Sequence, residues 1–383
     1  MARVLVLTPW YLPGYKAGGP IPSVANIVLA LKDEHDFSIV TTDRDHGETK
    51  PYPGIERDSW VKHESTPVFY FSPEKLSLGG LRTVLRSKPY DALYLNSVFE
   101  PRFAIMPLLL HKLGMIPRAR VIVAPRGQLS PGALQLKGGK KRLFMTLARA
   151  TGLYRNLTWH ASSAYEAEDI KRTFGPSGRI VIAPNLSRPS ENTAPTPAKS
   201  AGQLELVFVS RIQPKKNLHG ALELLRTLRG EVEFSIYGPL EDEAHWQECE
   251  AIIATLPPNI KVVYRGSVPR EQVTTVMAQS HVFYLLSFSE NYGHVILEAL
   301  VAGCPALISD QTAFRDLENK GVGWDLPLEA RERTVQILQS LVDMDENEYR
   351  RLSEAARAFG RKHVEDDSVV QKNRELFRVD KKH

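Results

Sequence analysis

Short hydrophobic runs rich in β-branched residues alternate with helical patterns along most of the chain. In the first helical pattern, apolar residues recur at i, i+3, i+4 and i+7 from Val24 to Leu31, so they line one face. Strands that alternate with helices predict a parallel sheet with right-handed crossovers. In the first half of the chain, strands are predicted at Val4–Thr8, Phe37–Thr42, Val68–Ser72, Ala92–Asn96, Val121–Pro125, Leu157–Ala161 and Ile180–Ala183.

A polar segment, SRPSENTAPTPAKS, interrupts this pattern from Ser187 to Ser200 and predicts an exposed linker. The alternation then restarts, and after the last strand a helical stretch begins at about Glu346. The fold class predicted is therefore α/β, with two Rossmann-like, doubly wound domains at residues 1–186 and 204–364 and a linker at 187–203. The strands predicted in the second half are Leu204–Ser210, Val232–Tyr237, Lys261–Tyr264, His281–Leu286 and Ala306–Ile308.

The composition is that of a globular protein, with 383 residues, 43% hydrophobic and 24% charged. No stretch is apolar for long enough to cross a bilayer, and the apolar run that starts at Val4 is too short for a signal peptide. The two cysteines, Cys249 and Cys304, are far apart and lie in no metal-binding pattern. We expect a reduced, cytoplasmic protein.

The net charge of +5 is distributed unevenly. Between Glu100 and Glu166 there is no acidic residue, and this acid-free stretch suggests a surface that meets an anionic partner, such as a phospholipid headgroup or a pyrophosphate. The alternative is a solvated face with a chance excess of one sign. Nucleic acid is not expected, because no binding motif accompanies the charge. The basic residues are Arg102, Lys112, Arg118, Arg120, Arg126, Lys137, Lys140, Lys141, Arg142, Arg149 and Arg155.

Chemistry-bearing residues follow the predicted strands of the second half, where parallel sheets bind their ligands. The loop after the first of these strands carries Arg211, Lys216 and Asn217, and Gly238 follows the second. Glu290 follows the fourth strand, just before a helix that starts at about His294. Cations that face a helix N-terminus would bind a diphosphate.

Glu298 lies within that helix on a mostly apolar face. A buried carboxylate needs a hydrogen-bond partner, and no neighbour in the sequence supplies one. The two hydroxyl groups of a ribose would supply such a partner. The alternative is an internal ion pair, for example with Arg315, or partial exposure.

Two signals in the first half are weaker. Gly18-Gly19-Pro20 lacks the spacing of a dinucleotide-binding loop, and it fits a close approach of the backbone to a ligand better. Asp43 and Asp45 have the spacing of a metal-binding pair but no third carboxylate, which predicts a solvated turn and no metal site. The lone histidines His111 and His160 are expected to be structural.

The segment SENYGHVILEALVAGCP resembles the Glu-x7-Glu motif of retaining glycosyltransferases with the GT-B fold, specifically glycosyltransferase family 4. VSRIQPKKN is similar to the phosphate-binding segment of that family, and the resemblance extends over nearly the whole chain. In the first domain, VAPRGQLSPGALQLKGGKKRLF is similar to members that build bacterial surface polysaccharides.

The resemblance implies a role for each of these residues. Glu290 would contact hydroxyls of the donor sugar and Glu298 the donor ribose, while Arg211 and Lys216 would hold the diphosphate. The other implied donor contacts are Asn217, Gly238, the backbone of Asn291, Tyr292, Gly293 and His294, and Gly18 and Gly19 from the first domain. The resemblance also implies two domains facing across a cleft, a last helix at about 365–383 that packs back onto the first domain, and transfer with retention and without metal or cofactor.

The chain departs from the family at two places. Many members carry a His after the strand equivalent to Ala92–Asn96, whereas this chain has Asn96 and Ser97 there. Pro184-Asn185-Leu186 stands where relatives often have Pro-Asn-Gly. We assign the acceptor side to Asn96 and to Arg126, Lys140 and Lys141 of the acid-free stretch.

The expected function is transfer of a hexose from GDP-mannose or a UDP-hexose to a hydroxyl of a lipid-linked or growing saccharide, in surface polysaccharide synthesis. The partners expected are the nucleotide sugar, this acceptor and the anionic inner membrane. The alternatives are a nucleotide-sugar epimerase, which needs no acceptor, and a non-catalytic protein that binds nucleotide sugars.

Overall fold

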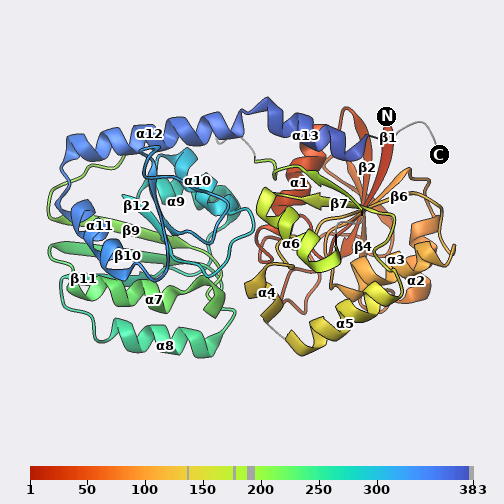
Figure 1. The fold of residues 1–383 in the computed structure, drawn as a ribbon, viewed down its shortest axis with the longest axis horizontal. Coiled ribbons are helices and arrows are strands. Elements are labelled where there is room, and N and C mark those ends of the chain that lie inside the picture. The colour runs from red at the N-terminus through yellow and green to blue at the C-terminus, as the bar shows by residue number, and fades with distance from the viewer. Residues whose placement is uncertain (136–137, 176–177, 188–194, 379–383) are drawn as a thin grey trace. The chain divides into compact units, whose positions relative to one another are not determined.

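The computed structural model describes residues 1–135, 138–175, 178–187 and 195–378, and the chain divides into two compact units (Figure 1). Unit 1 comprises Met1–Ser187 and Asp367–His383, and unit 2 comprises Arg188–Asp366. Residues 188–194 of the predicted linker lie outside the described residues. Lys199 was predicted to be exposed in this linker. It is buried instead, because its Nζ donates to the carbonyls of Val342 and Met344 in unit 2.

Unit 1 is built on an eight-stranded sheet in the order β3-β4-β2-β1-β5-β6-β7-β8. All neighbours are parallel except β3 and β4. The elements are β1 Ala2–Leu7, α1 Pro20–Leu31, β2 His35–Thr42, β3 Trp60–His63, β4 Thr66–Phe71, α2 Leu78–Arg86, β5 Ala92–Leu95, η1 Pro101–Ile105, α3 Met106–Lys112, β6 Arg120–Val123, α4 Pro131–Gln135, α5 Gly138–Ala150, β7 Thr158–Ala161, α6 Ala164–Phe174, β8 Arg179–Ile182 and α13 Asp367–Phe377.

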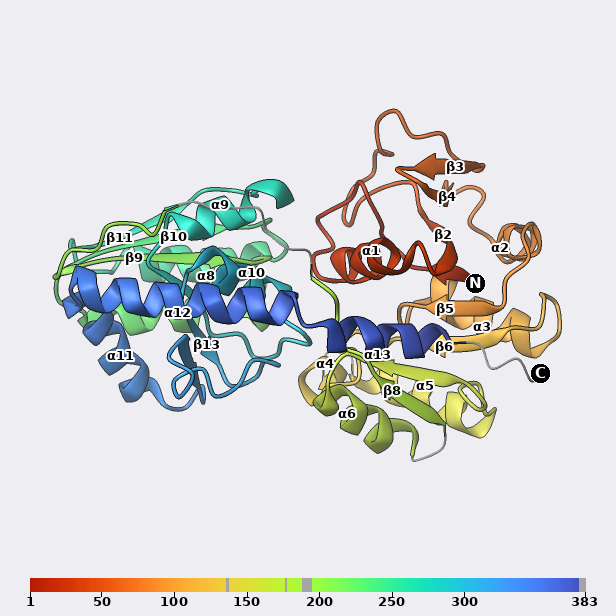
Figure 2. The ribbon, with the colours of Figure 1, turned by 90° about the horizontal axis from the view of Figure 1, so that it is seen from above.

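Helices cover both faces of this sheet. Leu108 of α3 and Ala148 of α5 belong to one apolar cluster, together with buried residues of α2 and α6. The opposite face is covered by α1 and by α13, which contacts α1 and β8 (Figure 2). The ring of Phe377 packs edge-on against Phe37 and Tyr94, so the last described helix is part of the core of unit 1.

Unit 2 is built on a six-stranded, all-parallel sheet in the order β11-β10-β9-β12-β13-β14. Figure 1 shows α9, α10 and α12 on one side of this sheet and α7 and α8 on the other. The elements are β9 Gln203–Val209, η2 Pro214–Lys216, α7 Leu218–Glu223, η3 Leu224–Thr227, β10 Glu231–Tyr237, α8 Glu243–Ile253, β11 Ile260–Tyr264, η4 Arg270–Gln272, α9 Val273–Ala278, β12 Val282–Leu285, α10 His294–Ala302, β13 Ala306–Ser309, β14 Gly323–Leu326, α11 Arg331–Asp343 and α12 Glu346–Val364.

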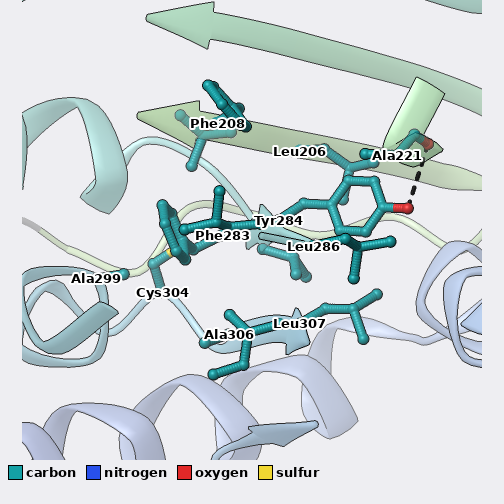
Figure 3. Packing of buried hydrophobic residues seen from close by; sticks show 14 of the residues in the cluster. Leu206, Phe208, Ala221, Phe283, Tyr284, Leu286, Ala299, Cys304, Ala306 and Leu307 are labelled. Carbon is teal, nitrogen blue, oxygen red and sulfur yellow. Dashed lines mark hydrogen bonds between the residues drawn. The ribbon is translucent and has the colours of Figure 1, made fainter. Parts of the chain in front are cut away.

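The central strands of unit 2 are apolar on both faces, because helices cover each side. Phe208 of β9 and Phe283 and Tyr284 of β12 are fully buried in one cluster (Figure 3). The hydroxyl of Tyr284 donates to the Ala221 carbonyl at 3.2 Å, which satisfies the one polar atom of this buried ring. The cluster fixes the ends of β9 and β12, from which the loops of the candidate site emerge.

Both sheets are doubly wound, as predicted. In unit 2 the chain order reverses between β9 and β12, and in unit 1 it reverses between β1 and β5. The carboxyl ends of the strands at such a switch point leave a crevice where ligands of this fold class bind. The predicted site residues should therefore lie at these two switch points.

Both cysteines are free and buried. Within the described residues, no helix has the length and apolar character needed to cross a membrane.

Candidate functional site

Backbone hydrogen bonds join the loops that follow β9, β10, β11 and β12 at one edge of the second sheet. The Gly238 amide after β10 donates to the Gly266 carbonyl after β11 at 2.9 Å. The Phe288 amide after β12 donates to the Lys215 carbonyl after β9, also at 2.9 Å. Residues from all four strand ends therefore lie at a single edge, as the parallel topology requires.

Lys216 and Glu290 form an ion pair at this edge, between the loops after β9 and β12. Their side chains are only 10% and 13% exposed. Burial would raise the pKa of the Glu290 carboxyl, but Lys216, and to a smaller extent Lys215 and Arg211, outweigh it, and the pKa lies below its ordinary value. This charged pair is therefore almost completely buried at the switch point of the sheet.

Arg211 also has a carboxylate partner. Its Nη1 donates to both oxygens of Glu241, at 2.9 and 3.2 Å. A bridge between Ile212 and Leu240 brings the loops after β9 and β10 together and places these two side chains side by side. The sequence analysis missed Glu241, because nothing in the spacing marks it as a partner for a residue 30 positions away.

Asn217 and Gly238 shape the loops. Asn217 has a left-handed backbone with φ 54°, and its Nδ2 donates to the Leu286 carbonyl at 2.9 Å. Gly238 has φ 148°, and a Cβ there would lie 1.8 Å from the Ser210 carbonyl oxygen. Only glycine allows this approach. The Asn217 side chain holds the β12 loop in place, and its predicted contact with the donor stays a prediction.

The helix predicted to start at about His294 does so. Gly293 precedes it with φ 76° and, as a glycine, has no side chain that could cap the helix start. The buried Tyr292 reaches His363 at the end of α12, with 3.3 Å between its hydroxyl oxygen and Nε2. The helix start therefore presents its partial positive charge next to Glu290.

Glu298 has an ion-pair partner, which the sequence analysis did not find. Arg270 of η4 approaches to 3.8 Å, and the Glu298 side chain is 29% exposed. This matches the alternative given in the sequence analysis, an internal ion pair with partial exposure, although with a different arginine, and the contact with a ribose stays a prediction. Arg315, the partner considered from the sequence, pairs with Asp310. Burial still raises the pKa of Glu298, and the Arg270 charge offsets this only in part.

In unit 1, Arg126 follows β6 at the carboxyl edge of the sheet with φ 54°. Its Nε and Nη2 donate to Asn96 Oδ1 at 3.2 and 2.8 Å, its Nη1 to Asn185 Oδ1 at 2.5 Å, and its Nη2 to the Tyr94 hydroxyl at 2.6 Å. All of these acceptors are neutral. The nearby Glu166 carboxylate instead accepts from the amides of Gly127 and Ser162 and from the Ser162 hydroxyl.

His160 contacts the cluster around Arg126 through Tyr94. One ring nitrogen lies 2.8 Å from the Ala183 carbonyl, so it carries the proton, and Nδ1 accepts from the Tyr94 hydroxyl at 2.6 Å. Burial, with a smaller contribution from Arg126, lowers the pKa of His160 to about 3. His160 is therefore a neutral structural residue, as expected, and so is His111, which pairs with the Ala119 carbonyl.

The glycine loop after β1 is held by Asp45. This carboxylate is 7% exposed and accepts from the backbone amides of Tyr15, Lys16 and His46. Asp43 is fully buried and pairs with Arg44 and Arg57. The prediction of a solvated turn is wrong for both residues, because each carboxylate has enough donors to be stable without water.

Gly18 and Gly19 form the end of that loop. Gly18 has φ 69°, and Gly19 precedes α1 with Pro20 as its first residue. The Gly19 carbonyl accepts from the Ser23 hydroxyl at 2.7 Å. A role toward the donor stays a prediction for both glycines.

The two lysines assigned to the acceptor side lie on α5. Lys140 is exposed, and Lys141 Nζ donates to the Ala133 carbonyl at 2.5 Å and lies 5.4 Å from the centre of the Phe99 ring. Lys141 therefore ties α5 to α4. These two contacts of Lys141 lead to α4 and to Phe99 and not to the Arg126 cluster. No group of three or more His, Cys, Asp or Glu with the arrangement of a metal site occurs among the described residues.

Both halves of the chain match known protein families. Residues 18–186 match the glycosyl transferase 4-like domain, and residues 190–359 match glycosyl transferases group 1. A curated relative, the O-antigen chain mannosyltransferase B of Escherichia coli, is 29% identical over 198 residues. That match covers 47% of this chain and 50% of the relative, about half the length of each.

Solved structures share the fold over its whole length. Sucrose-phosphate synthase from Thermosynechococcus elongatus superposes with a TM-score of 0.70 at 14% identity, over 98% of both chains. HepE of Anabaena, in complex with UDP and glucose, also superposes with a TM-score of 0.70, at 16% identity and over 98% of both chains. The two-domain fold, the two family matches and the Glu290–Glu298 spacing agree, and the chain belongs to the family 4-type glycosyltransferases with the GT-B fold.

Proposed function

We propose that this protein transfers a hexose from a nucleoside-diphosphate sugar to a hydroxyl of a lipid-linked or growing saccharide, with retention at the transferred carbon. The observation that carries the proposal is the nearly buried ion pair between Lys216 and Glu290. The pair lies at the switch point of unit 2, Glu290 is four residues before the start of α10, and Glu298 follows Glu290 by eight residues. A site with these parts suits a ligand that carries both phosphates and hydroxyl groups.

Lys216 and Arg211 are the residues that hold the diphosphate in this proposal. In the structure each of these cations is paired with a carboxylate. Binding of the diphosphate would therefore replace a protein carboxylate with a phosphate oxygen as the partner of each cation. Arg211 offers a flat fork of donors and Lys216 a compact charge. As the bond between the sugar carbon and the phosphate oxygen breaks, negative charge builds on that oxygen, where these cations and the helix start stabilise it.

Glu290, released from Lys216, accepts hydrogen bonds from hydroxyls of the donor sugar. The acceptor oxygen then bonds to the sugar carbon on the face from which the diphosphate leaves, and its proton passes to the departing phosphate oxygen. We therefore propose retention without a covalent intermediate. The positive charge that the step requires comes from Lys216, Arg211 and α10, and we propose that no metal takes part.

Glu298 holds the ribose in this proposal. Its raised pKa and its long contact with Arg270, at 3.8 Å, indicate a carboxylate whose charge the protein compensates only in part. Two ribose hydroxyls would donate to its two oxygens and complete its hydrogen bonding. This is the interaction that distinguishes a nucleotide from a simple phosphate.

The acceptor belongs to unit 1 in this proposal, near Arg126. The guanidinium donates to three neutral side chains, and no described carboxylate contacts it directly. An acceptor that carries a phosphate, as a lipid-linked saccharide does, would supply the balancing charge. Asn96, where many family members have a His, serves here to orient Arg126.

The donor is a GDP- or UDP-hexose in this proposal. The curated relative is named for mannose transfer, and HepE was solved with UDP and glucose. We place the enzyme in surface polysaccharide synthesis, in the cytoplasm.

The first experiment is a thermal-shift panel of UDP, GDP, ADP and their sugars, because a true donor stabilises only the state that binds it. The second offers the best donor, labelled in the sugar, to a membrane-lipid extract. We expect label in the lipid fraction with the wild type and none with Lys216→Ala. A changed sugar without any acceptor would indicate an epimerase, and binding without turnover would indicate a non-catalytic binding protein.

A further inference from the structure

Two helices of unit 1 expose leucines in the acid-free stretch between Glu100 and Glu166. Leu143 and Leu147 of α5 are 64% and 56% exposed, Leu109 of α3 is 43% exposed, and Leu113, which directly follows α3, is 70% exposed. Each pair is spaced by four residues, so its members lie one helical turn apart on the same face. Within the described residues, these are four of the seven exposed leucines, although the acid-free stretch is a small part of the chain.

The two helices cover the same face of the sheet. Leu108 of α3 and Ala148 of α5 share one buried cluster, which leaves the opposite sides of both helices facing outward. Lys112, next to Leu113, donates through Nζ to the Gly152 carbonyl just after α5. The exposed side of α3 therefore adjoins the end of α5.

Basic residues surround these leucines without acidic partners. Lys140 and Arg142 of α5, Lys112 of α3 and Arg118 after it are exposed. None of the four is in a salt bridge in the described part of the chain. By contrast, Lys171 and Arg172 of α6, in the same unit, pair with Glu168 and Asp169. The excess of positive charge is thus local to the leucine face.

We propose that this face of α3 and α5 docks on an anionic phospholipid bilayer. The leucines enter the boundary between headgroups and acyl chains, and the lysines and arginines contact the headgroup phosphates. Apolar residues flanked by unpaired cations suit a lipid surface better than nucleic acid, which offers phosphate but no apolar layer. The docking places unit 1, the acceptor-binding unit in the proposed function, where a lipid-linked acceptor resides.

The test is co-sedimentation of the full chain with vesicles of phosphatidylcholine alone or with about one third phosphatidylglycerol. We expect the wild type to bind the anionic vesicles and to leave the neutral ones unbound, and added salt to weaken the binding. Equal binding to both vesicles, or none to either, would overturn the proposal. So would tighter binding to a DNA duplex than to the anionic vesicles.

Two variants separate the apolar from the charged contribution. Leu143→Ser with Leu147→Ser should weaken vesicle binding at least tenfold, because apolar area no longer enters the bilayer. Lys140→Gln with Arg142→Gln should weaken it about 25-fold, at about fivefold for each basic residue near an anionic surface. Unchanged binding in either variant would contradict the proposal.

Each variant has a matched control in the same unit. Leu29→Ser with Ile182→Thr removes exposed apolar side chains from α1 and β8, and Lys171→Gln with Arg172→Gln removes charges that are already paired. Both controls should keep wild-type vesicle binding, and an equal loss in them would overturn the assignment to this face. The vesicle assay contains no nucleotide, so it can fail while the nucleotide-induced thermal shift succeeds, and the two proposals are judged separately.

Discussion

The carboxyl edges of the two sheets differ in the partners that they offer to positively charged side chains. In unit 2, Lys216, Arg211 and Arg270 each face a carboxylate. In unit 1, Arg126 donates to neutral amides and a phenol. At the first edge each of these cations is paired with a carboxylate, so a diphosphate would have to replace those ion pairs. At the second edge the arginine has no direct carboxylate partner among the described residues, so an anionic ligand could bind it without replacing one. In the proposed function, this difference means that the donor edge releases its product as its ion pairs form again, whereas the acceptor edge selects for charge.

The largest effect is expected from Lys216→Ala. The variant removes the cation that faces the departing phosphate, and the rate of transfer should fall by about 100-fold or more. Single-turnover kinetics with saturating donor measures this directly. The control is Lys261→Ala, which breaks an exposed pair with Glu233 in the same sheet and should keep the wild-type rate. A loss of less than threefold in Lys216→Ala would contradict the proposed role of the lysine.

Arg126→Gln tests the other edge. With a phosphate-bearing acceptor, kcat/KM should fall by about 10- to 100-fold, because a charge-assisted contact of about 1.5–3 kcal/mol is lost. The affinity for the nucleotide should be unchanged. A matched assay uses an acceptor without phosphate, for which wild type and variant should perform alike. Equal losses with both acceptors would show that Arg126 only supports the fold.

The two glutamates of the motif should differ in their effect on stability. Glu290→Gln leaves Lys216 buried without its counter-ion and should lower the free energy of unfolding at pH 7 by about 1–3 kcal/mol. Glu298→Gln removes a poorly compensated carboxylate and should leave stability unchanged or raise it. Urea unfolding measures both, and a larger loss in Glu298→Gln than in Glu290→Gln would reverse the comparison.

The smallest effect is expected in the pH dependence of folding stability, to which Glu290 and Glu298 contribute with opposite signs. The pKa of Glu290 is lowered in the folded state, so its contribution is present above the ordinary pKa of about 4.3 and is lost as the pH falls through the folded value. The pKa of Glu298 is raised, so its carboxyl costs stability as the pH rises from about 4.3 through the folded value. Each variant should therefore approach the wild type in stability at low pH. A difference from the wild type that persists undiminished there would contradict this.

Hydrophobic periodicity was sufficient to predict most of the fold. Buried parallel strands are continuous apolar runs, and every strand predicted from them is present within a few residues. The strands that were missed are β3, an antiparallel edge strand that is only half-buried, and β14, which has four residues and begins with glycine. Neither has an apolar run of the length that marks a buried strand.

The candidate site was predictable where residues follow strands and not where partners come from distant loops. Lys216 and Glu290 could be placed at one edge because the parallel topology brings strand ends together. Arg270 and Glu241 could not, since their positions depend on how the loops after β11 and β10 fold. Asp45 was misread for the same reason, because its three donors are backbone amides, which leave no mark in the sequence.

The central claim is that the carboxyl edge of unit 2 binds a nucleoside diphosphate through Lys216 and Glu298 together. Calorimetric titration of the wild type and of Glu298→Ala with the nucleoside diphosphate that gives the largest thermal shift tests it most directly. We predict that the variant binds at least tenfold more weakly, because the ribose loses its acceptor. Equal affinity in wild type and variant would contradict the account.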